Sequence, residues 1–379
     1  MTPTHPLQSA IFRMVRAILR SDVGGEHWRQ VGTGRGNGYP TVRALALLTA
    51  GLLAAGPVVQ AETSILDLPS PVSEYLLTHW SSDDGLPQNS IISMAQTSDG
   101  YIWLSTFGGL ARFDGVHFEV FDGDLVPALA GEYFSTLRAD QRGNLWMHGG
   151  HKGLVVGRNG HFRQLGEAEG LPPTGVEAIE VSSDGNVWVG DVKGRLLRWD
   201  GQRFVVAAEN PPTPNWGLLG SMATDWSGRL WAQCYHEIAV FEQGHWTVVL
   251  HTEKACPILP LHDGSFLHVR GDNCQELTRL VDGKLTDFGR IPGGFSGHFV
   301  REDARGNIWF TAGSGVLRLE PSGRWTRLSP ADGLMVDTVR SELTDREGNF
   351  WLGTDGGGLV RLKHRAVRAV GQPDGMSKR

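Results

Sequence analysis

The sequence predicts an all-β fold, a seven-bladed β-propeller whose blades each have four short antiparallel strands. Three observations predict it. A short phrase that ends in tryptophan recurs along the chain at a nearly constant spacing. The same series of short apolar segments follows each copy. The chain also has 51 glycines, 13 tryptophans and 15 phenylalanines, a composition expected of many strands joined by tight turns, because glycine allows φ > 0 and aromatic side chains fill pleated surfaces.

The repeated phrase is an Asp-Gly or Gly-Asn turn, then an apolar residue, then tryptophan. The tryptophans are spaced by 43, 42, 43, 78 and 42 residues, and they are Trp103, Trp146, Trp188, Trp231, Trp309 and Trp351. The long interval predicts one degenerate copy, in which Leu267 takes the tryptophan position. Seven units of about 42 residues have the period of propeller blades. We expect each of these seven residues to pack between neighbouring blades.

Each unit contains four apolar segments, with the turn residues of two-residue hairpins between them. The segment at the outer position can be counted separately, and it occurs eight times for seven blades. The first and last occurrences, residues 74–80 and 366–370, therefore compete for one place. We expect residues 74–80 to pair with the strand around residues 358–362 and so to close the ring.

The ends of the chain are expected to lie outside the ring. The segment from Arg43 to Ala61 has one positive charge, an apolar stretch and small residues near its end, which is the order of a secretory signal. An uncleaved membrane anchor is the alternative. We therefore assign residues 1–61 to an N-terminal extension and signal peptide, 62–370 to the propeller, and 371–379 to the start of a further, interrupted repeat.

Charge and cysteine content narrow the function. Residues 62–379 carry 29 basic and 39 acidic side chains, a net charge of −10, which disfavours binding to nucleic acid. The chain has three cysteines. In an oxidising compartment Cys256 and Cys274 are candidates for a bridge, and buried or free thiols are the alternative. No cofactor is expected.

The stretch from Trp80 to Ile91, WSSDDGLPQNSI, and the residues after Ser98, DGYIWLSTFGGLARFDGVHFEVFD, closely resemble the two-component regulator propeller repeat. The resemblance covers roughly residues 72–376. It implies a periplasmic sensor propeller that works with a membrane helix and a cytoplasmic histidine kinase or diguanylate cyclase. The sequence has no motif of either output module, so the resemblance implies that the output lies in a missing C-terminal region or a partner.

Candidate binding residues lie in the turns after the tryptophan strands, where the repeat is least uniform. A rigid scaffold with variable loops is typical of binding proteins. The alternative is that these are ordinary polar turns. The candidates are Phe107, His151, Lys152, Asp191, Lys193, His236, Glu237, Asp272, Asn273 and Asp355.

Other conspicuous residues are interpreted as structural. His148 and His151 without a third ligand are weak grounds for a metal site, and none is predicted. The aspartates of the Asp-Gly turns, Asp99, Asp184 and Asp263, are expected to hold those turns.

Three function classes remain. The leading hypothesis is a periplasmic module that senses an unknown ligand, which could be a small molecule, a glycan or a protein, and whose homodimerisation stays open. A secreted propeller enzyme, such as a lyase or glycosidase, would need converging acid and base groups, and no such motif is found. An interaction scaffold would share every feature of the sensor.

Overall fold

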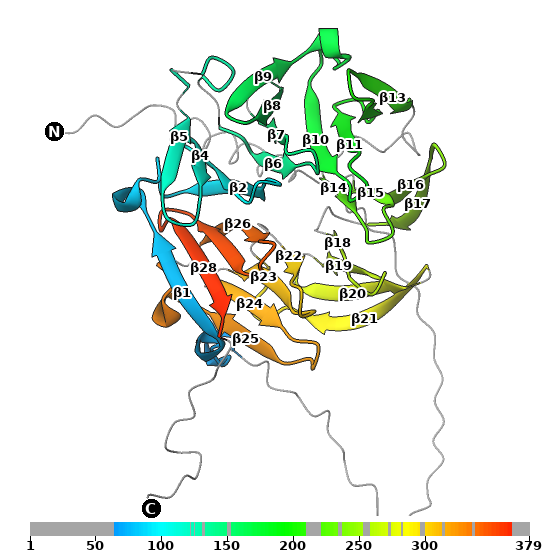
Figure 1. Ribbon diagram of the computed structural model, residues 1–379. Helices are drawn as coiled ribbons and strands as arrows, with labels where there is room; N and C mark the ends of the chain where they lie inside the picture. The colour runs from blue at the N-terminus through cyan, green and yellow to red at the C-terminus, as the bar shows by residue number, and fades with distance from the viewer. Residues whose placement is uncertain are drawn as a thin grey trace, which may run out of the picture. The chain divides into compact units, whose positions relative to one another are not determined.

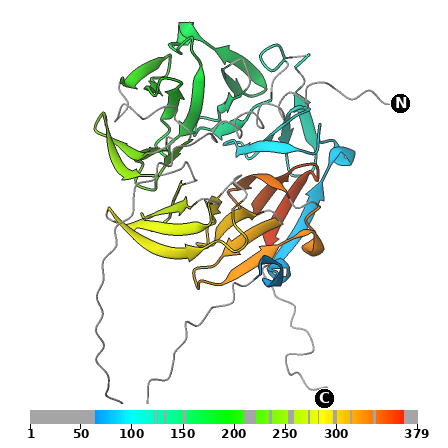
Figure 2. The same ribbon diagram turned by 180° about the vertical axis from the view of Figure 1, so that it is seen from behind.

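The computed structural model describes residues 64–365, apart from residues 122, 125, 131–132, 150–152, 210–220, 234–236, 253–257, 272–273, 282, 296–299, 313–314 and 336–337. All described residues belong to one compact unit. They form a ring of seven four-stranded antiparallel sheets, which Figures 1 and 2 show from opposite sides. The predicted seven-bladed propeller is confirmed.

The blades follow one another in chain order, and each begins with its innermost strand. The strands of blades one to three are β2 (Ile91–Gln96), β3 (Ile102–Thr106), β4 (Gly109–Phe113) and β5 (Phe118–Phe121); β6 (Thr136–Ala139), β7 (Leu145–His148), β8 (Leu154–Arg158) and β9 (His161–Leu165); and β10 (Val176–Val181), β11 (Val187–Asp191), β12 (Leu196–Trp199) and β13 (Phe204–Ala208). Those of blades four and five are β14 (Ser221–Thr224), β15 (Leu230–Gln233), β16 (Glu237–Glu242) and β17 (His245–His251), then β18 (Ile258–Pro260), β19 (Phe266–Arg270), β20 (Glu276–Val281) and β21 (Lys284–Arg290).

Blades six and seven complete the ring. Their strands are β22 (Val300–Glu302), β23 (Ile308–Ala312), β24 (Gly315–Leu319) and β25 (Trp325–Leu328), then β26 (Val339–Thr344), β27 (Phe350–Thr354), β28 (Leu359–His364) and the N-terminal β1 (Tyr75–Trp80). Single turns of 3-10 helix occur between strands, at η1 (Ile65–Asp67), η2 (Val72–Glu74), η3 (Ser82–Asp84), η4 (Glu167–Glu169) and η5 (Pro330–Asp332). The degenerate copy that contains Leu267 forms blade five, as the spacing predicts.

The ring is closed by its N-terminal strand. β1 pairs antiparallel with β28, from Tyr75 opposite His364 to Trp80 opposite Leu359, and is the outermost strand of blade seven. Figure 1 shows this blue strand beside the red one. The expected pairing of residues 74–80 is therefore confirmed. The competing segment 366–370 lies outside the described residues, as do residues 1–61 and 371–379.

A buried arginine ties the closing strand to blade six. The side chain of Arg318 is 2% exposed, and its guanidinium donates to both carboxylate oxygens of Glu74, at 2.7 and 2.9 Å. It also donates to the hydroxyl of Tyr75, at 2.9 Å. These hydrogen bonds lower the pKa of the Glu74 carboxyl. A bidentate pair of this kind fixes orientation as well as distance, so it sets the position at which β1 enters the ring.

The repeated tryptophans pack against the following blade, as the sequence predicts. Trp103, Trp146, Trp231, Trp309 and Trp351 are buried, as is Leu267, whereas Trp188 is half-buried. Their aromatic partners in the next blade are respectively Phe162, Trp199, Phe266, Phe350 and Phe113, and Trp188 contacts Phe241. The hydrophobic core is therefore divided among the interfaces between blades. Most of these interfaces share a repeat tryptophan that packs on the next blade.

Antiparallel strands place alternate turns at opposite ends of each blade. One face, here called the loop face, carries the turn between the second and third strands and the connections between blades. The other, here called the hairpin face, carries the two remaining hairpin turns of each blade. The described part of the chain has no helix long and apolar enough to cross a membrane.

Candidate functional site

A channel of about 700 Å³ runs along the inner strands of all seven blades. Its wall carries two ion pairs between neighbouring blades. Arg138 Nε lies 3.0 Å from Glu180 Oε2, and Arg301 Nε lies 2.9 Å from Glu342 Oε2. Thr224 donates to the other oxygen of Glu180, at 3.2 Å. The charge of Glu342 raises the pKa of the Arg301 guanidinium, so this arginine stays charged.

At the loop face, two aromatic rings stand beside the channel. The side chain of Phe107 is 53% exposed and that of Tyr133 is 46% exposed. Their ring centroids are 5.3 Å apart in an edge-to-face arrangement. Large aromatic surfaces are usually buried, so an exposed pair of this kind is a candidate contact for a ligand or partner.

A tight turn positions the Phe107 ring. Thr106 Oγ1 donates to the carbonyl of Gly109 at 2.9 Å and accepts from the N–H of Gly108 at 3.1 Å. A Cβ on Gly108 would lie 2.9 Å from the carbonyl oxygen of Pro87, so only glycine fits there without movement. The turn is therefore held against the connection that contains Pro87, and Phe107 is presented on a fixed support.

An arginine links these rings to the channel. Arg340 lines the channel, and its Cζ lies 5.9 Å from the centroid of the Phe107 ring. Its Nη2 lies 2.6 Å from Oδ2 of Asp355, and Oδ1 of Asp355 accepts from the hydroxyl of Ser90 at 2.8 Å. We call these side chains the mouth cluster, which consists of Phe107, Tyr133, Arg340 and Asp355. The mouth cluster combines an apolar surface with a fixed pair of charges.

The structure brings together two of the candidates that the sequence identifies, Phe107 and Asp355. Asp191 is buried, and its carboxylate accepts from the backbone of Lys193 and from the backbone and side chain of Arg195, so it holds its own turn. Lys193 is exposed in that turn. Glu237 is buried at the start of β16, with Oε1 3.3 Å from His251 Nδ1. The remaining candidates lie outside the described residues, and they are His151, Lys152, His236, Asp272 and Asn273.

Asp184 and Asp263 have the structural role expected of them. Ser182 donates to the carboxylate of Asp184, and the backbone of Ser265 donates to Asp263. His148 is largely buried, with Nε2 2.7 Å from the Val176 carbonyl, and burial lowers the pKa of its imidazole. Across the described ranges no group of three His, Cys, Asp or Glu side chains could hold a metal.

Cys274 is disulfide-bonded, and its partner lies outside the described residues. The interpretation of this cysteine as a free thiol is therefore wrong, and which cysteine pairs with it stays open.

Sequence reasoning missed Tyr133, Arg340 and the charged channel wall. A signal for the channel was present in the repeat. Arg138, Glu180 and Arg301 are the cross-strand partners of Trp146, Trp188 and Trp309. The same position in other blades holds alanine or leucine, so these charges stand out once the units are aligned.

The fold and this site define a β-propeller with a charged channel and an aromatic mouth. Residues 85–108, which include β2, β3 and Phe107, match the model of the two component regulator propeller family. The resemblance to that repeat is thereby confirmed at its first copy.

Solved structures with the same fold have several roles. The extracellular domain of a putative hybrid two component system from B. thetaiotaomicron superposes with a TM-score of 0.62 at 17% identity, over 77% of this chain and 42% of that one. A catalytically inactive form of virginiamycin B lyase from Staphylococcus aureus, with quinupristin, gives a TM-score of 0.61 at 14% identity, over 77% and 100%. YCF48 bound to D1 peptide gives 0.60 at 15% identity, over 79% and 100%. These likenesses concern the fold.

Among curated proteins, the photosystem II assembly lipoprotein Ycf48 of Synechococcus sp. (strain RCC307) is 24% identical over 127 residues, which are 33% of this chain and 38% of that protein. This chain thus spans less than half the length of that relative and of the hybrid-system extracellular domain.

Proposed function

We propose that this propeller is the sensing module of a two-component signal transduction protein, that it works in the periplasm, and that it has no catalytic activity of its own. The family match at residues 85–108 and the likeness to the extracellular domain of a hybrid two component system support the class. The signal output, a histidine kinase or diguanylate cyclase, would come from another region or partner.

The mouth cluster is the observation that carries the proposal. Its exposed rings, Phe107 and Tyr133, offer an apolar contact surface, and the Arg340–Asp355 pair beside them offers both hydrogen-bond donors and acceptors. Ligand sites commonly combine an apolar lining with a few fixed polar groups. A ligand would stack on the rings and reach the channel through Arg340.

The arrangement favours recognition over catalysis. General acid–base chemistry needs a proton-transferring group within reach of substrate. Three described carboxylates line the channel, and each is paired with an arginine: Glu180, Glu342 and Asp225. The likeness to virginiamycin B lyase keeps the enzyme as the second candidate, which the same experiment can test.

The test is a thermal-shift screen of the purified chain against a fixed panel of monosaccharides, disaccharides, amino acids and short peptides. At least one compound should raise the Tm, because a ligand that binds only the folded state stabilises it. The shift should be lost in the Phe107→Ala and Tyr133→Ala variants. It should persist in Val116→Ser, a matched control at an exposed residue of the hairpin face.

A shift that survives both aromatic substitutions would contradict the mouth cluster as the site. For the enzyme alternative, quinupristin and each binding compound would be incubated with the chain and analysed by mass spectrometry. Conversion of any of them would overturn the non-catalytic proposal.

A further inference from the structure

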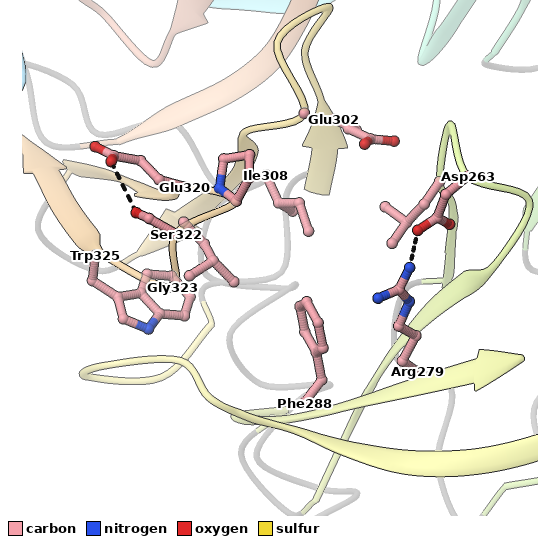
Figure 3. Close-up of a pocket in the computed structure, with 13 residues that line it drawn as sticks. Asp263, Arg279, Phe288, Glu302, Ile308, Glu320, Ser322, Gly323 and Trp325 are labelled. Carbon is pink, nitrogen blue, oxygen red and sulfur yellow. Dashed lines mark hydrogen bonds and ion pairs between the residues drawn. The ribbon is translucent and has the colours of Figure 1, made fainter.

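Blade five lacks the pair of residues that fills the space between most blades. In five of the other six blades, a buried tryptophan donates its indole N–H to a residue six positions earlier in the chain. In blade five, Leu267 replaces the tryptophan and Leu261 replaces its acceptor. Between blades five and six lies a cleft of about 490 Å³, shown in Figure 3.

The interface between blades two and three shows how this space is normally filled. The ring of Trp146 meets Trp199 and Phe204 of blade three edge to face, at centroid distances of 5.5 and 6.1 Å. Its Nε1 donates to Oδ2 of Asp140 at 2.9 Å. One indole is thus enclosed by aromatic rings on one side and a carboxylate on the other.

The walls of the cleft are the equivalents of these residues. Leu319 and Trp325 face each other across β24 and β25, as Trp199 and Phe204 do across β12 and β13. Both line the cleft, and so does Leu261 at the position of Asp140. Leu267 is buried but shorter than an indole. The groups that elsewhere receive a tryptophan therefore face an open space.

The position of Arg279 also indicates that an aromatic side chain is missing from this interface. It is the cross-strand partner of Leu267, as Arg318 is of Trp309. In blade six the Cζ of Arg318 lies 5.7 Å from the indole centroid of Trp309. In blade five Arg279 instead lies over Phe288, at 5.6 Å, and pairs with Asp263. Figure 3 shows this pair across the cleft from Trp325.

The polar rim selects among aromatic ligands. Three carboxylates line the cleft. Asp263 is paired with Arg279, and Glu320 is paired with Arg318 and Arg324, so Glu302 is the one that no arginine of the described residues neutralises. Glu302 accepts from the backbone N–H of His262 at 2.6 Å, which fixes its side chain. The Glu302 carboxylate offers an acceptor to an N–H donor and repels an anion. The chemistry suits a neutral or cationic ring.

We propose that the cleft between blades five and six is a second binding site, which accepts an indole-like aromatic group with a hydrogen-bond donor, free or as a tryptophan side chain. The ligand takes the place of the missing repeat tryptophan and packs on Trp325 and Leu319. Its N–H donates to a rim carboxylate. This site does not depend on the function proposed for the mouth cluster.

The experiment titrates the full chain with 5-fluoroindole and follows the ¹⁹F signal. Saturable binding is expected. Leu267→Trp should fill the cleft and weaken binding by about tenfold or more. Trp325→Ala removes one wall and should weaken it by roughly two- to tenfold, the contribution of one aromatic contact. Phe107→Ala, at the mouth cluster, and Val116→Ala, at an exposed hairpin-face residue of blade one, should leave it unchanged.

Two further competition measurements test the ligand class on the unmodified chain. Their results do not depend on whether a variant folds. Tryptamine should compete with 5-fluoroindole more strongly than indole-3-acetate, because no arginine of the described residues neutralises the Glu302 carboxylate on the rim. Competition by N-acetyltryptophanamide would identify a partner's side chain as an acceptable source, and its failure beside binding of free indole would restrict the site to small molecules.

The proposal is overturned by absence of saturable binding, by unchanged affinity in folded Leu267→Trp and Trp325→Ala, or by preference for indole-3-acetate. Loss of binding in Phe107→Ala alone would move the indole to the mouth cluster and also overturn it.

Discussion

Trp351 donates its indole N–H to Oδ2 of Asp345 at 2.7 Å, and this bond repeats around the ring. Equivalent bonds of 2.8–2.9 Å join the corresponding pairs, Asp140 to Trp146, Asp225 to Trp231, and Asp303 to Trp309. In blade one Thr97 takes the place of the aspartate and accepts from Trp103 at 3.0 Å. The buried carboxylate joins the hairpin turn to the tryptophan that packs on the next blade.

Asp345 is the most direct test of this bond. Its carboxylate accepts from the backbone and side-chain nitrogens of Asn349 as well as from Trp351. In Asp345→Asn, either orientation of the amide sets an NH₂ group against one of these donors. We expect a loss of about 2 kcal/mol in the free energy of unfolding, because a buried donor left without its acceptor costs about 1–3 kcal/mol.

Urea denaturation of Asp345→Asn measures this, with Asp83→Asn at an exposed position as the matched control. A loss in Asp345→Asn no larger than in the control would show that the indole bond does not contribute.

The repeat tryptophans should differ in energetic weight. Trp309 is buried between Phe350 and Tyr75 and is bonded to Asp303, so Trp309→Ala should cost about 3–5 kcal/mol. Trp188 is half-buried, and six residues before it stands Ser182, whose hydroxyl donates to Asp184. We expect Trp188→Ala to cost less, about 1–3 kcal/mol. Chemical denaturation of both variants gives the order, and a larger loss at Trp188 would contradict it.

The sequence predicts the fold well because every blade places a large apolar side chain at the same position, against the next blade. The tryptophan period and the single Leu267 exception follow from that requirement, and counting outer segments identifies the closing strand at Tyr75–Trp80. Because every repeat unit packs in the same way, a comparison of the units shows which residues this packing requires.

The candidate site was less predictable, for two physical reasons. An aspartate in a turn can face a ligand or accept hydrogen bonds from its own turn, and the structure shows that Asp191 does the latter. Tyr133 lies in a connection between blades, outside the repeat register, so periodicity gives it no expected neighbour. Phe107 could be identified from the sequence because the equivalent turns of the other blades hold polar residues at this place.

A buried histidine should make the ring sensitive to mild acid. Burial lowers the pKa of His268 in β19 to about 4, with a smaller effect from Arg270. Because this folded-state pKa is below the ordinary value of about 6.5, the unfolded chain binds the proton more readily. The contribution of neutral His268 to the free energy of unfolding is complete above about pH 6.5 and is lost as the pH falls toward 4.

Between pH 7.5 and 5 this histidine alone should remove about 2 kcal/mol from the free energy of unfolding. Urea midpoints of the wild-type chain and of His268→Gln, compared at the two pH values, measure it. The variant should lose less stability on acidification than the wild type. Exposed His161→Gln serves as the control, and equal acid losses in all three proteins would refute the assignment.

The closing strand supports the final prediction, that the N-terminal segment holds the ring shut. β1 supplies the outermost strand of blade seven, and Glu74 and Tyr75 satisfy the buried guanidinium of Arg318. Deleting residues 72–82 would leave β28 as an open sheet edge, strip Trp80 from the rings of Trp351 and Phe113, and leave Arg318 with a buried charge short of partners. We expect the shortened chain to aggregate on size-exclusion chromatography and to lose its cooperative urea transition. Deleting residues 366–379 should be tolerated, because β1 already occupies the place for which 366–370 competes. To separate the strand from the ion pair, Arg318→Met would keep β1 but remove the charge, and it should remain a closed, monodisperse ring. If the C-terminal deletion proves the more damaging of the two, the ring depends on residues after β28 for closure and the role given to β1 is wrong.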